Sequence, residues 1–476
     1  MASDVWRVRE AGQSMGLVLN VGKCEVIAHP GCRVDHVFLS SFQQVSPDNA
    51  TLLGAPLSHG EALDTEWKNR CDDLTRASNR LKLIGSQQAL LLLRAAFGAP
   101  RVQHILRESP SANHQALSTF DNIQRSSLNS IINSELTEVQ WLQATLPIKD
   151  GGLGVRRVSS LAISAFMASA SSTLNLQNAI LSKFPCPTDL FADSSLASWV
   201  SAFGLPPPAP MSCKQSAWDR PGIVADRGQV QANVHTPREK AVFLASLAAH
   251  SGDWLSALPI ASCGLHLDND AVRVAVAMRL GLNVCMPHPC HCGAQVDAWG
   301  YHAFTCKKAQ GRIARHQALN DVIARSLSTA GIPVMKEPLG LARTDGKRPD
   351  GLTLVPWSLG KALTWDVTVA TTLAESYIVS SSRSAGAAAE HAAIRKTDKY
   401  SQLPACYIFQ PIALETLGAI NTSAIEFLSE VGKRISQISG EPRATQFLFQ
   451  RLSVGLQRYN SILLYQSFVA MDEPDL

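Results

Sequence analysis

Hydrophobic residues recur with helical spacing through the first half of the chain. The positions i, i+4, i+8 and i+11 of one such stretch hold Leu63, Trp67, Cys71 and Leu74. This spacing places all of them on one face, so it predicts an amphipathic helix from about residue 61. A second apolar helix is predicted from Gln88 to about Phe97, ended by Gly98 and Pro100. A helix rich in small residues is predicted from about Leu161.

The spacing changes to period two in other segments. Leu17 and Leu19 alternate around Val18, which predicts a small piece of sheet in residues 1–60. Further along, Leu363, Trp365, Val367 and Val369 alternate with Thr364, Asp366 and Thr368. This predicts a strand in which Asp366 lies on the face opposite Trp365. Helices are predicted over 235–284, 311–329 and 385–400 and in a closing pair, so the fold class is mixed α+β.

Proline and composition bound the organisation of the chain. The prolines of a stretch over 185–215 are Pro185, Pro187, Pro206, Pro207, Pro208 and Pro210. They predict an extended, solvated linker, because proline disfavours helix. The 476 residues correspond to about three domains. Hydrophobic residues make up 46% and charged residues 17%, which excludes a mostly disordered chain.

Charge and hydropathy restrict where the protein acts. No apolar run is long enough for a membrane helix, and the charged N-terminus MASDVWRVRE is unlike a signal peptide. We therefore expect an intracellular protein with no membrane partner. The 43 basic and 39 acidic residues give a net charge of +4, which permits nucleic acid as a partner. No small-molecule substrate is evident.

A cluster of cysteine and histidine has the composition of a metal site. Cys290 and Cys292 are followed after nine residues by His302 and after three more by Cys306. Three thiolates and one imidazole suit tetrahedral Zn²⁺, and four protein ligands make the site structural. Cys285 is an alternative to Cys290, and a cysteine-rich loop without metal is the other interpretation. Gly293 permits the tight turn that such a knuckle needs.

Two aspartates and a lysine suggest a second site. Asp350 lies at the start of one predicted strand and Asp366 in the middle of the next. If these strands form a hairpin, the carboxylates converge, while the helix over 385–400 brings Arg395, Lys396 and Lys399. Two carboxylates that hold Mg²⁺ and a lysine that stabilises negative charge fit phosphodiester hydrolysis. Solvated carboxylates at strand ends are the alternative.

Several motifs of the second half together resemble one family. Beside the Cys/His knuckle they are Arg315-His316, Arg348-Pro349-Asp350, Trp365-Asp366-Val367-Thr368 and Arg395-Lys396-x-x-Lys399-Tyr400. This set is similar to the C-terminal half of non-LTR (LINE-type) retrotransposon reverse transcriptases that carry a restriction-like endonuclease of the PD-(D/E)xK fold. The resemblance implies that Asp350 and Asp366 are the acidic metal ligands, with Mg²⁺ or Mn²⁺ as cofactor. It implies Lys396 as the catalytic lysine, and Glu337 is a further candidate acid.

The first half resembles the same family. The segment Gly16-Leu17-Val18-Leu19-Asn20-x-x-Lys23 is similar to the reverse-transcriptase segment after the catalytic hairpin, and Lys23 to the lysine that assists pyrophosphate release. Residues 52–57 resemble a primer grip, and Leu146-Pro147 with residues 151–154 resemble part of the thumb. The implied organisation is a palm remnant (1–60), a helical thumb (61–184), a linker and helical connector (185–284), a zinc knuckle (285–310) and a nuclease domain (311–476).

One departure from the family decides the expected activity. Polymerase chemistry needs an Asp-Asp hairpin before the Gly16 segment, where Asp4 is the sole aspartate, and Asp72-Asp73 falls within an amphipathic helix. We therefore expect the chain to begin after the polymerase active site and to lack intrinsic DNA synthesis. The expected function is a metal-dependent endonuclease that nicks target DNA. The alternative is a non-catalytic nucleic-acid-binding remnant of a truncated retroelement.

Basic residues are expected to hold DNA and RNA. They concentrate around the knuckle and the proposed site, where clustered cations can contact phosphates. The residues expected in these contacts are Lys23, Lys307, Lys308, Arg312, Arg315, His316, Arg348 and Lys399. A nuclear location is implied by the resemblance.

Overall fold

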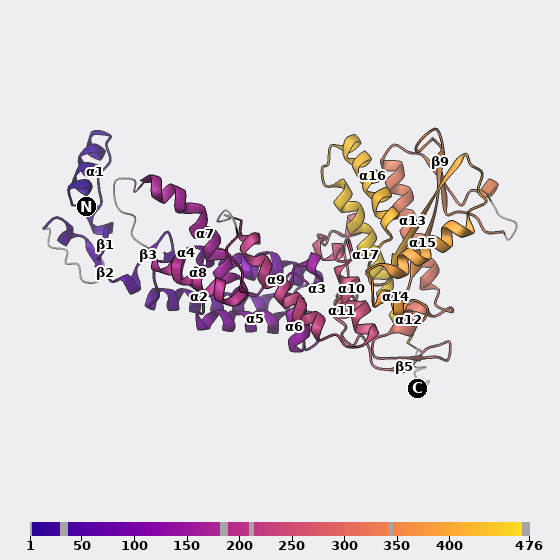
Figure 1. The fold of residues 1–476 in the computed structure, drawn as a ribbon, viewed down its shortest axis with the longest axis horizontal. Helices are drawn as coiled ribbons and strands as arrows, with labels where there is room; N and C mark the ends of the chain where they lie inside the picture. The colour runs from indigo at the N-terminus through magenta and orange to yellow at the C-terminus, as the bar shows by residue number, and fades with distance from the viewer. Residues whose placement is uncertain (1, 29–36, 181–188, 209–213, 342–345, 469–476) are drawn as a thin grey trace, which may run out of the picture. The chain divides into compact units, whose positions relative to one another are not determined.

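Two compact units make up the chain, each built from several segments. The computed structural model describes residues 2–28, 37–180, 189–208, 214–341 and 346–468 (Figure 1). The first unit comprises Met1–Ser78, Phe97–Gln124 and Arg157–Gly222. The second comprises Asn79–Ala96, Arg125–Arg156 and Ile223–Leu476.

The first unit is mainly helical. Its helices are α1 (Ala2–Ser14), α2 (Glu61–Leu81, with its last turn in the second unit), α4 (Ala99–Glu108), the start of α5 (Gln115–Ile132), α7 (Val158–Ile180), α8 (Leu190–Phe203) and the start of α9 (Gln215–Ala232). The sheet expected in residues 1–60 takes the form of two short pairs, β1 (Glu25–Ile27) with β2 (Gln43–Val45) and β3 (Thr51–Leu52) with β4 (Ala55–Pro56). No strand forms at Leu17–Leu19, which follow α1.

Tryptophans fill the core of the first unit. Trp67, on the predicted face of α2, is fully buried, and its indole N–H donates to Ser111 Oγ at 3.1 Å. Trp199 and Trp218 pack edge to face with ring centres 5.2 Å apart. Such pairs combine a large buried area with a favourable ring geometry. The helix in residues 61–81 is thus confirmed.

The proline-rich stretch differs from its prediction. Helix α8 occupies Leu190–Phe203 inside the segment expected to be an extended linker. The carboxylate of Asp189 accepts from the N–H groups of Phe191 and Ala192, so it caps the helix. The free energy gained by burying Trp199 outweighs the preference of the flanking prolines for an extended chain. Pro185, Pro187 and Pro210 lie outside the described residues.

The second unit joins a helical region to an α/β region. Its helices include α3 (Ser86–Leu92), α6 (Glu138–Thr145), α10 (Pro237–Leu247), α11 (Asn269–Leu280), α12 (Tyr301–Thr305), α13 (Gly311–Thr329), α14 (Ile378–Ser381), α15 (Ala387–Lys399), α16 (Thr422–Ser439) and α17 (Ala444–Tyr465). Its strands are β5 (His288–Pro289), β6 (Gln295–Val296), β7 (Val334–Lys336), β8 (Gly351–Thr353), β9 (Ala362–Ala370) and β10 (Tyr407–Glu415). The predicted helix over 311–329 is confirmed.

A four-stranded mixed sheet organises the α/β region. The strand order is β10-β9-β8-β7, with β9 and β10 parallel and the other pairs antiparallel. The hairpin-like pairing of β8 with β9 sets Gly351 opposite Trp365. A Cβ atom at Gly351 would lie 2.0 Å from the Trp365 ring, so glycine allows the indole to cover this point of the strand.

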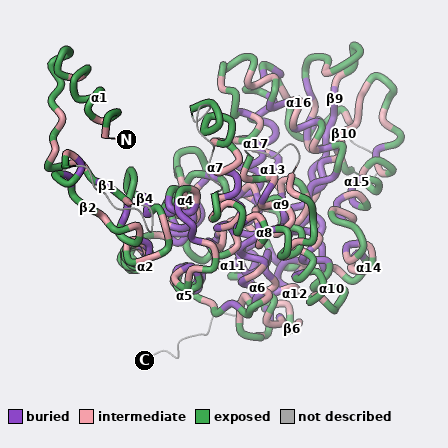
Figure 2. Tube along the Cα trace, turned by 60° about the vertical axis from the view of Figure 1, so that its left-hand side comes forward, coloured by how far each residue is buried: buried purple, intermediate pink, exposed green. Residues whose placement is uncertain are grey.

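Helices cover both faces of this sheet. Trp365 and its neighbours on β9 pack against α13, α16 and α17 in a continuous core. The other face packs against the alanine-rich side of α15, where Ala388, Ala389, Ala392 and Ala393 approach the strands closely. Strand β9 is therefore largely buried (Figure 2). Trp365 lies in the core formed with α13, α16 and α17, so the predicted placement of Trp365 and Asp366 on opposite faces of the strand is confirmed.

Among the helices of the described residues, none combines the length and the apolar character needed to span a membrane.

Candidate functional site

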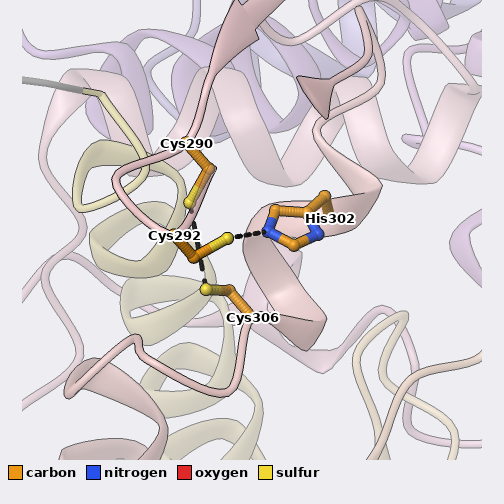
Figure 3. A group of neighbouring side chains, drawn as sticks. All are labelled: Cys290, Cys292, His302 and Cys306. Atoms are coloured by element: carbon orange, nitrogen blue, oxygen red, sulfur yellow. Dashed lines mark hydrogen bonds between the residues drawn. The ribbon is translucent and has the colours of Figure 1, made fainter. Parts of the chain in front are cut away.

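The Cys/His cluster is formed by a short hairpin and one turn of helix. The Cys290 N–H donates to Ala294 O at 2.8 Å, which closes the β5–β6 hairpin around Cys292. Gly293 has φ +93°, the left-handed conformation that glycine adopts without strain, as predicted. His302 lies in α12 and Cys306 ends that helix, so both project from one side (Figure 3).

The four side chains have the geometry of a zinc site. Their ligand atoms all lie within 4.8 Å of one another. A Zn–S bond of about 2.3 Å in a tetrahedron sets sulfurs about 3.8 Å apart, and the Cys290 and Cys306 sulfurs are 3.8 Å apart. His302 Nε2 lies 3.0 Å from Cys292 Sγ. The cluster can therefore hold a zinc ion through three sulfurs and one nitrogen.

The surroundings distinguish these cysteines chemically. The Ala294 N–H donates to Cys292 and lowers the pKa of its thiol to about 6, which favours the thiolate that binds metal. Burial raises the pKa of Cys290. Cys285, the alternative ligand, instead contacts the Asp297 carbonyl at 3.3 Å and lies outside the group of four. The choice left open by the sequence thus falls on Cys290.

Asp350 and Asp366 converge as the hairpin hypothesis required. Oδ2 of Asp350 accepts from the Val367 N–H at 2.6 Å, one residue beyond Asp366. The same oxygen lies 2.9 Å from His316 Nε2, which is also 3.1 Å from Val367 O. Since both neighbours of Nε2 are acceptors, this nitrogen carries a proton. The hydrogen bond to Asp350 raises the pKa of His316.

Asp366 is a buried carboxylate with cationic and phenolic partners. It is 2% exposed, and Tyr400 OH donates to its Oδ2 at 2.7 Å. Lys396 forms an ion pair with Oδ1, and Lys399 Nζ lies 3.9 Å from Oδ2. Such partners offset the desolvation of a buried carboxylate. The structure thus gathers Asp350, just before β8, with Asp366 of β9 and Lys396 of α15.

Glu337 and Arg348 lie at the edge of this group. Glu337 forms an ion pair with Arg348, and its side chain is 56% exposed. It has φ +48°, and its backbone N–H donates to the Asp350 carbonyl at 3.1 Å, so its backbone lies beside Asp350 while its side chain pairs with Arg348. Tyr400 OH also lies 2.7 Å from the Arg348 carbonyl oxygen, so its one proton is shared between this carbonyl and Asp366, which connects the Arg-Pro-Asp segment to the end of α15.

The basic residues divide by exposure. Lys307, Lys308 and Arg312 are exposed just after the cluster, and Lys23 is exposed in the first unit. Arg315, expected among the nucleic-acid contacts, is instead 2% exposed and donates to Asn460 at 2.9 Å. Burial lowers its pKa to about 10. It faces inward because α13 packs against α17 at that position, so it does not reach a ligand in solution.

Two residues of the carboxylate site were not among the predicted site residues. Tyr400, which the resemblance included in a motif without a role, lies 2.7 Å from both Asp366 Oδ2 and the Arg348 carbonyl oxygen. Asn320 accepts from the Trp365 indole at 2.8 Å and donates to Asp350 O at 3.3 Å. Asn320 lies four residues after His316 on α13, so the two side chains share one helix face. This spacing is the sequence signal that could have identified Asn320.

Comparison with known proteins gives the chain a context. No protein-family model matches it. The sequence is similar to a retrotransposon protein. This relative, the Retrotransposable element SLACS 132 kDa protein of Trypanosoma brucei gambiense, is 24% identical over 345 residues. The aligned part covers 72% of this chain and 25% of the relative. The chain thus spans about a quarter of the relative's length, and the similarity supports an origin in a retroelement.

Proposed function

We propose that this chain is a retroelement-derived endonuclease that nicks DNA with Mg²⁺ or Mn²⁺. The observation that carries the proposal is the convergence of Asp350, Asp366 and Lys396 from three elements. Aspartate is rare in strands, and a residue that breaks such a local preference indicates a functional site. Asp366 is 2% exposed in the middle of β9. Similarity to a retrotransposon protein supports the retroelement origin in this proposal.

The carboxylates fit a divalent metal. Both hydrogen bonds that the Asp350 side chain forms with described residues use Oδ2, and among these residues none bonds to its Oδ1. Oδ1 of Asp366 is buried and paired with Lys396. Mg²⁺ binds through one or two carboxylates together with substrate phosphate. When bound, the metal would clamp the scissile phosphate and lower the pKa of its water.

The other side chains of the site prepare it for an anionic substrate. Lys396 pairs with Asp366 and would place a positive charge where negative charge develops on the phosphate. Protonated Nε2 of His316 fixes the carboxylate of Asp350 in one orientation. Lys307, Lys308 and Arg312 offer exposed cations for the nucleic-acid backbone. A DNA target would place the protein in the nucleus.

The proposal extends to the organisation of the chain. Residues 311–476 would form the PD-(D/E)xK nuclease, preceded by the zinc knuckle at 285–310 and the connector at 185–284. Residues 61–184 would correspond to a thumb and residues 1–60 to the edge of a palm with its Lys23. The mixed sheet with carboxylates on adjacent strands supports the nuclease assignment.

A nicking assay tests the function. Purified protein is incubated with supercoiled plasmid and Mg²⁺ or Mn²⁺ beside the variant Asp350→Ala. We expect the wild type to nick and the variant to lose on the order of 10³-fold in rate, since a residue of a cooperating catalytic set is removed. Asp321→Ala is the matched control, because Asp321 pairs with Lys336 on the surface. Equal nicking by wild type and Asp350→Ala would contradict the catalytic role of Asp350, and no nicking by either would favour a nucleic-acid-binding protein without turnover.

A further inference from the structure

A cavity in the second unit is not used by either site. Its volume is about 470 Å³, and its wall includes Trp299, Tyr301, Arg238, Gln140, Asn233 and Val242. Trp299 and Tyr301 flank the start of α12, the helix that supplies His302 to the cluster. Pockets of this size hold small organic ligands. The cavity is therefore a candidate binding site beside the metal cluster.

Two aromatic rings form a fixed wall of the cavity. The rings of Trp299 and Tyr301 are 6.0 Å apart and inclined by 14°. Gly300 between them has φ +70°, and a Cβ there would lie 2.9 Å from both Leu464 and Val284. Packing thus holds the backbone that orients both rings. Trp299 remains 42% exposed, which leaves much of a large apolar ring in contact with water.

Polar groups around the rings complement a heterocycle. The Gln140 Oε1 accepts from the Thr137 N–H in a helix cap, and no described residue bonds its Nε2. The Asn233 Nδ2 donates to Gln229 O, and no described residue bonds its Oδ1. Arg238 lies 5.1 Å above the Tyr301 ring. An aromatic wall is thus combined with an amide donor, an amide acceptor and a guanidinium.

We propose that this cavity receives an unpaired base of single-stranded nucleic acid, stacked on Trp299. Stacking on an aromatic side chain and hydrogen bonds to the base edge are the means by which proteins hold unpaired bases. Glu239 in the wall uses its carboxylate to accept from the N–H groups of His235 and Thr236 at 2.9 Å. It therefore belongs to the cap of α10, whereas Arg238, 50% exposed and 3.7 Å from Asp297 Oδ2, is the cation of the wall that a phosphate can approach from solvent. The inference rests on the proposed function only in taking nucleic acid as the partner.

Binding of short labelled oligonucleotides tests this site. Fluorescence anisotropy is measured without added Mg²⁺ for single-stranded RNA, single-stranded DNA and a duplex of the same length. We expect Trp299→Ala to weaken single-strand binding about tenfold and Trp299→Phe to retain most of it. Trp6→Ala is the matched control, because Trp6 is 50% exposed on α1 and outside the cavity. The RNA and DNA arms show which nucleic acid supplies the base.

Two results would overturn the proposal. One is equal single-strand binding by wild type and Trp299→Ala, with unfolding temperature and zinc content showing that the variant folds. The other is a loss on duplex as large as on single strands. Failure of the wild type to nick plasmid would count against the nuclease alone. Equal single-strand binding would count against the cavity alone, so the two failures are distinguishable.

Discussion

The Cys/His cluster and the carboxylate site lie in the same unit, but they are assembled in opposite ways. All four ligands of the cluster fall between residues 290 and 306, on one hairpin and one helical turn. The carboxylate site draws on α13, β8, β9 and α15, from His316 to Tyr400. One site is thus a local motif, while the other exists only after a sheet and its covering helices have packed.

This difference predicts different behaviour on damage. A local metal site contributes its binding free energy directly to the folding of its segment. Cys290 and Cys306 also belong to the core that packs against Leu463 and Leu464 of α17. The carboxylate site instead contains buried charges, whose desolvation cost the rest of the folded sheet must offset. Loss of a cluster ligand should therefore affect stability, and loss of a carboxylate-site residue should affect activity.

The largest effect is expected from removing a cluster ligand. Cys292→Ala should reduce bound zinc from about one equivalent to below about 0.1, and lower the unfolding temperature by about 10 °C. Cys292 is half-buried, so the loss reports metal rather than packing. Metal analysis and thermal unfolding measure both quantities. Cys285→Ala, at another half-buried cysteine, should keep its zinc. If both variants kept zinc, the ligand set would be wrong.

A smaller effect separates the two lysines of the carboxylate site. Lys396 contacts Asp366 Oδ1, whereas Lys399 donates to Tyr400 OH at 2.8 Å. Lys396→Gln should therefore slow plasmid nicking about 100-fold and Lys399→Gln less than about tenfold. Nicking rates with matched unfolding curves give the comparison. A larger loss for Lys399→Gln would transfer the role to that residue.

The smallest effect is a pH dependence from His316. Its hydrogen bond to Asp350 raises its pKa above the ordinary 6.5, with Asp366 acting in the same direction, and burial and Lys396 opposing. The stabilisation is therefore complete below pH 6.5 and is lost as the pH rises through the folded-state pKa. Because the side chain is 37% exposed, solvent screening limits it to under about 1 kcal/mol.

The variant His316→Gln measures this pH-dependent stabilisation. Its unfolding temperature should fall below that of the wild type by about 2 °C near pH 6 and approach it in alkaline solution. His391→Gln, which changes a histidine of α15 near the Tyr377 ring, serves as the control. A difference that grows with pH would contradict the sign of the His316 interaction.

Prediction from the sequence succeeded where the signal was local and repeated. The helix at Gly311–Thr329 has a regular apolar face, and β9 has strict alternation around Trp365. It failed at α8, where buried Trp199 outweighed the surrounding prolines. It also placed Arg315 among surface contacts, because a basic residue near others gives no sign that its helix face is covered by α17.

The sequence by itself determined the cluster, the strand that carries Asp366 and the helix that carries Lys396, because ligand spacing and hydrophobic period are local properties. Only the tertiary structure decided that Cys285 bonds to backbone, that the Glu337 side chain pairs with Arg348 and that His316 and Tyr400 reach the carboxylates. It alone formed the cavity beside Trp299. These outcomes depend on which elements pack together, and contacts between residues far apart in the chain leave no fixed spacing to read.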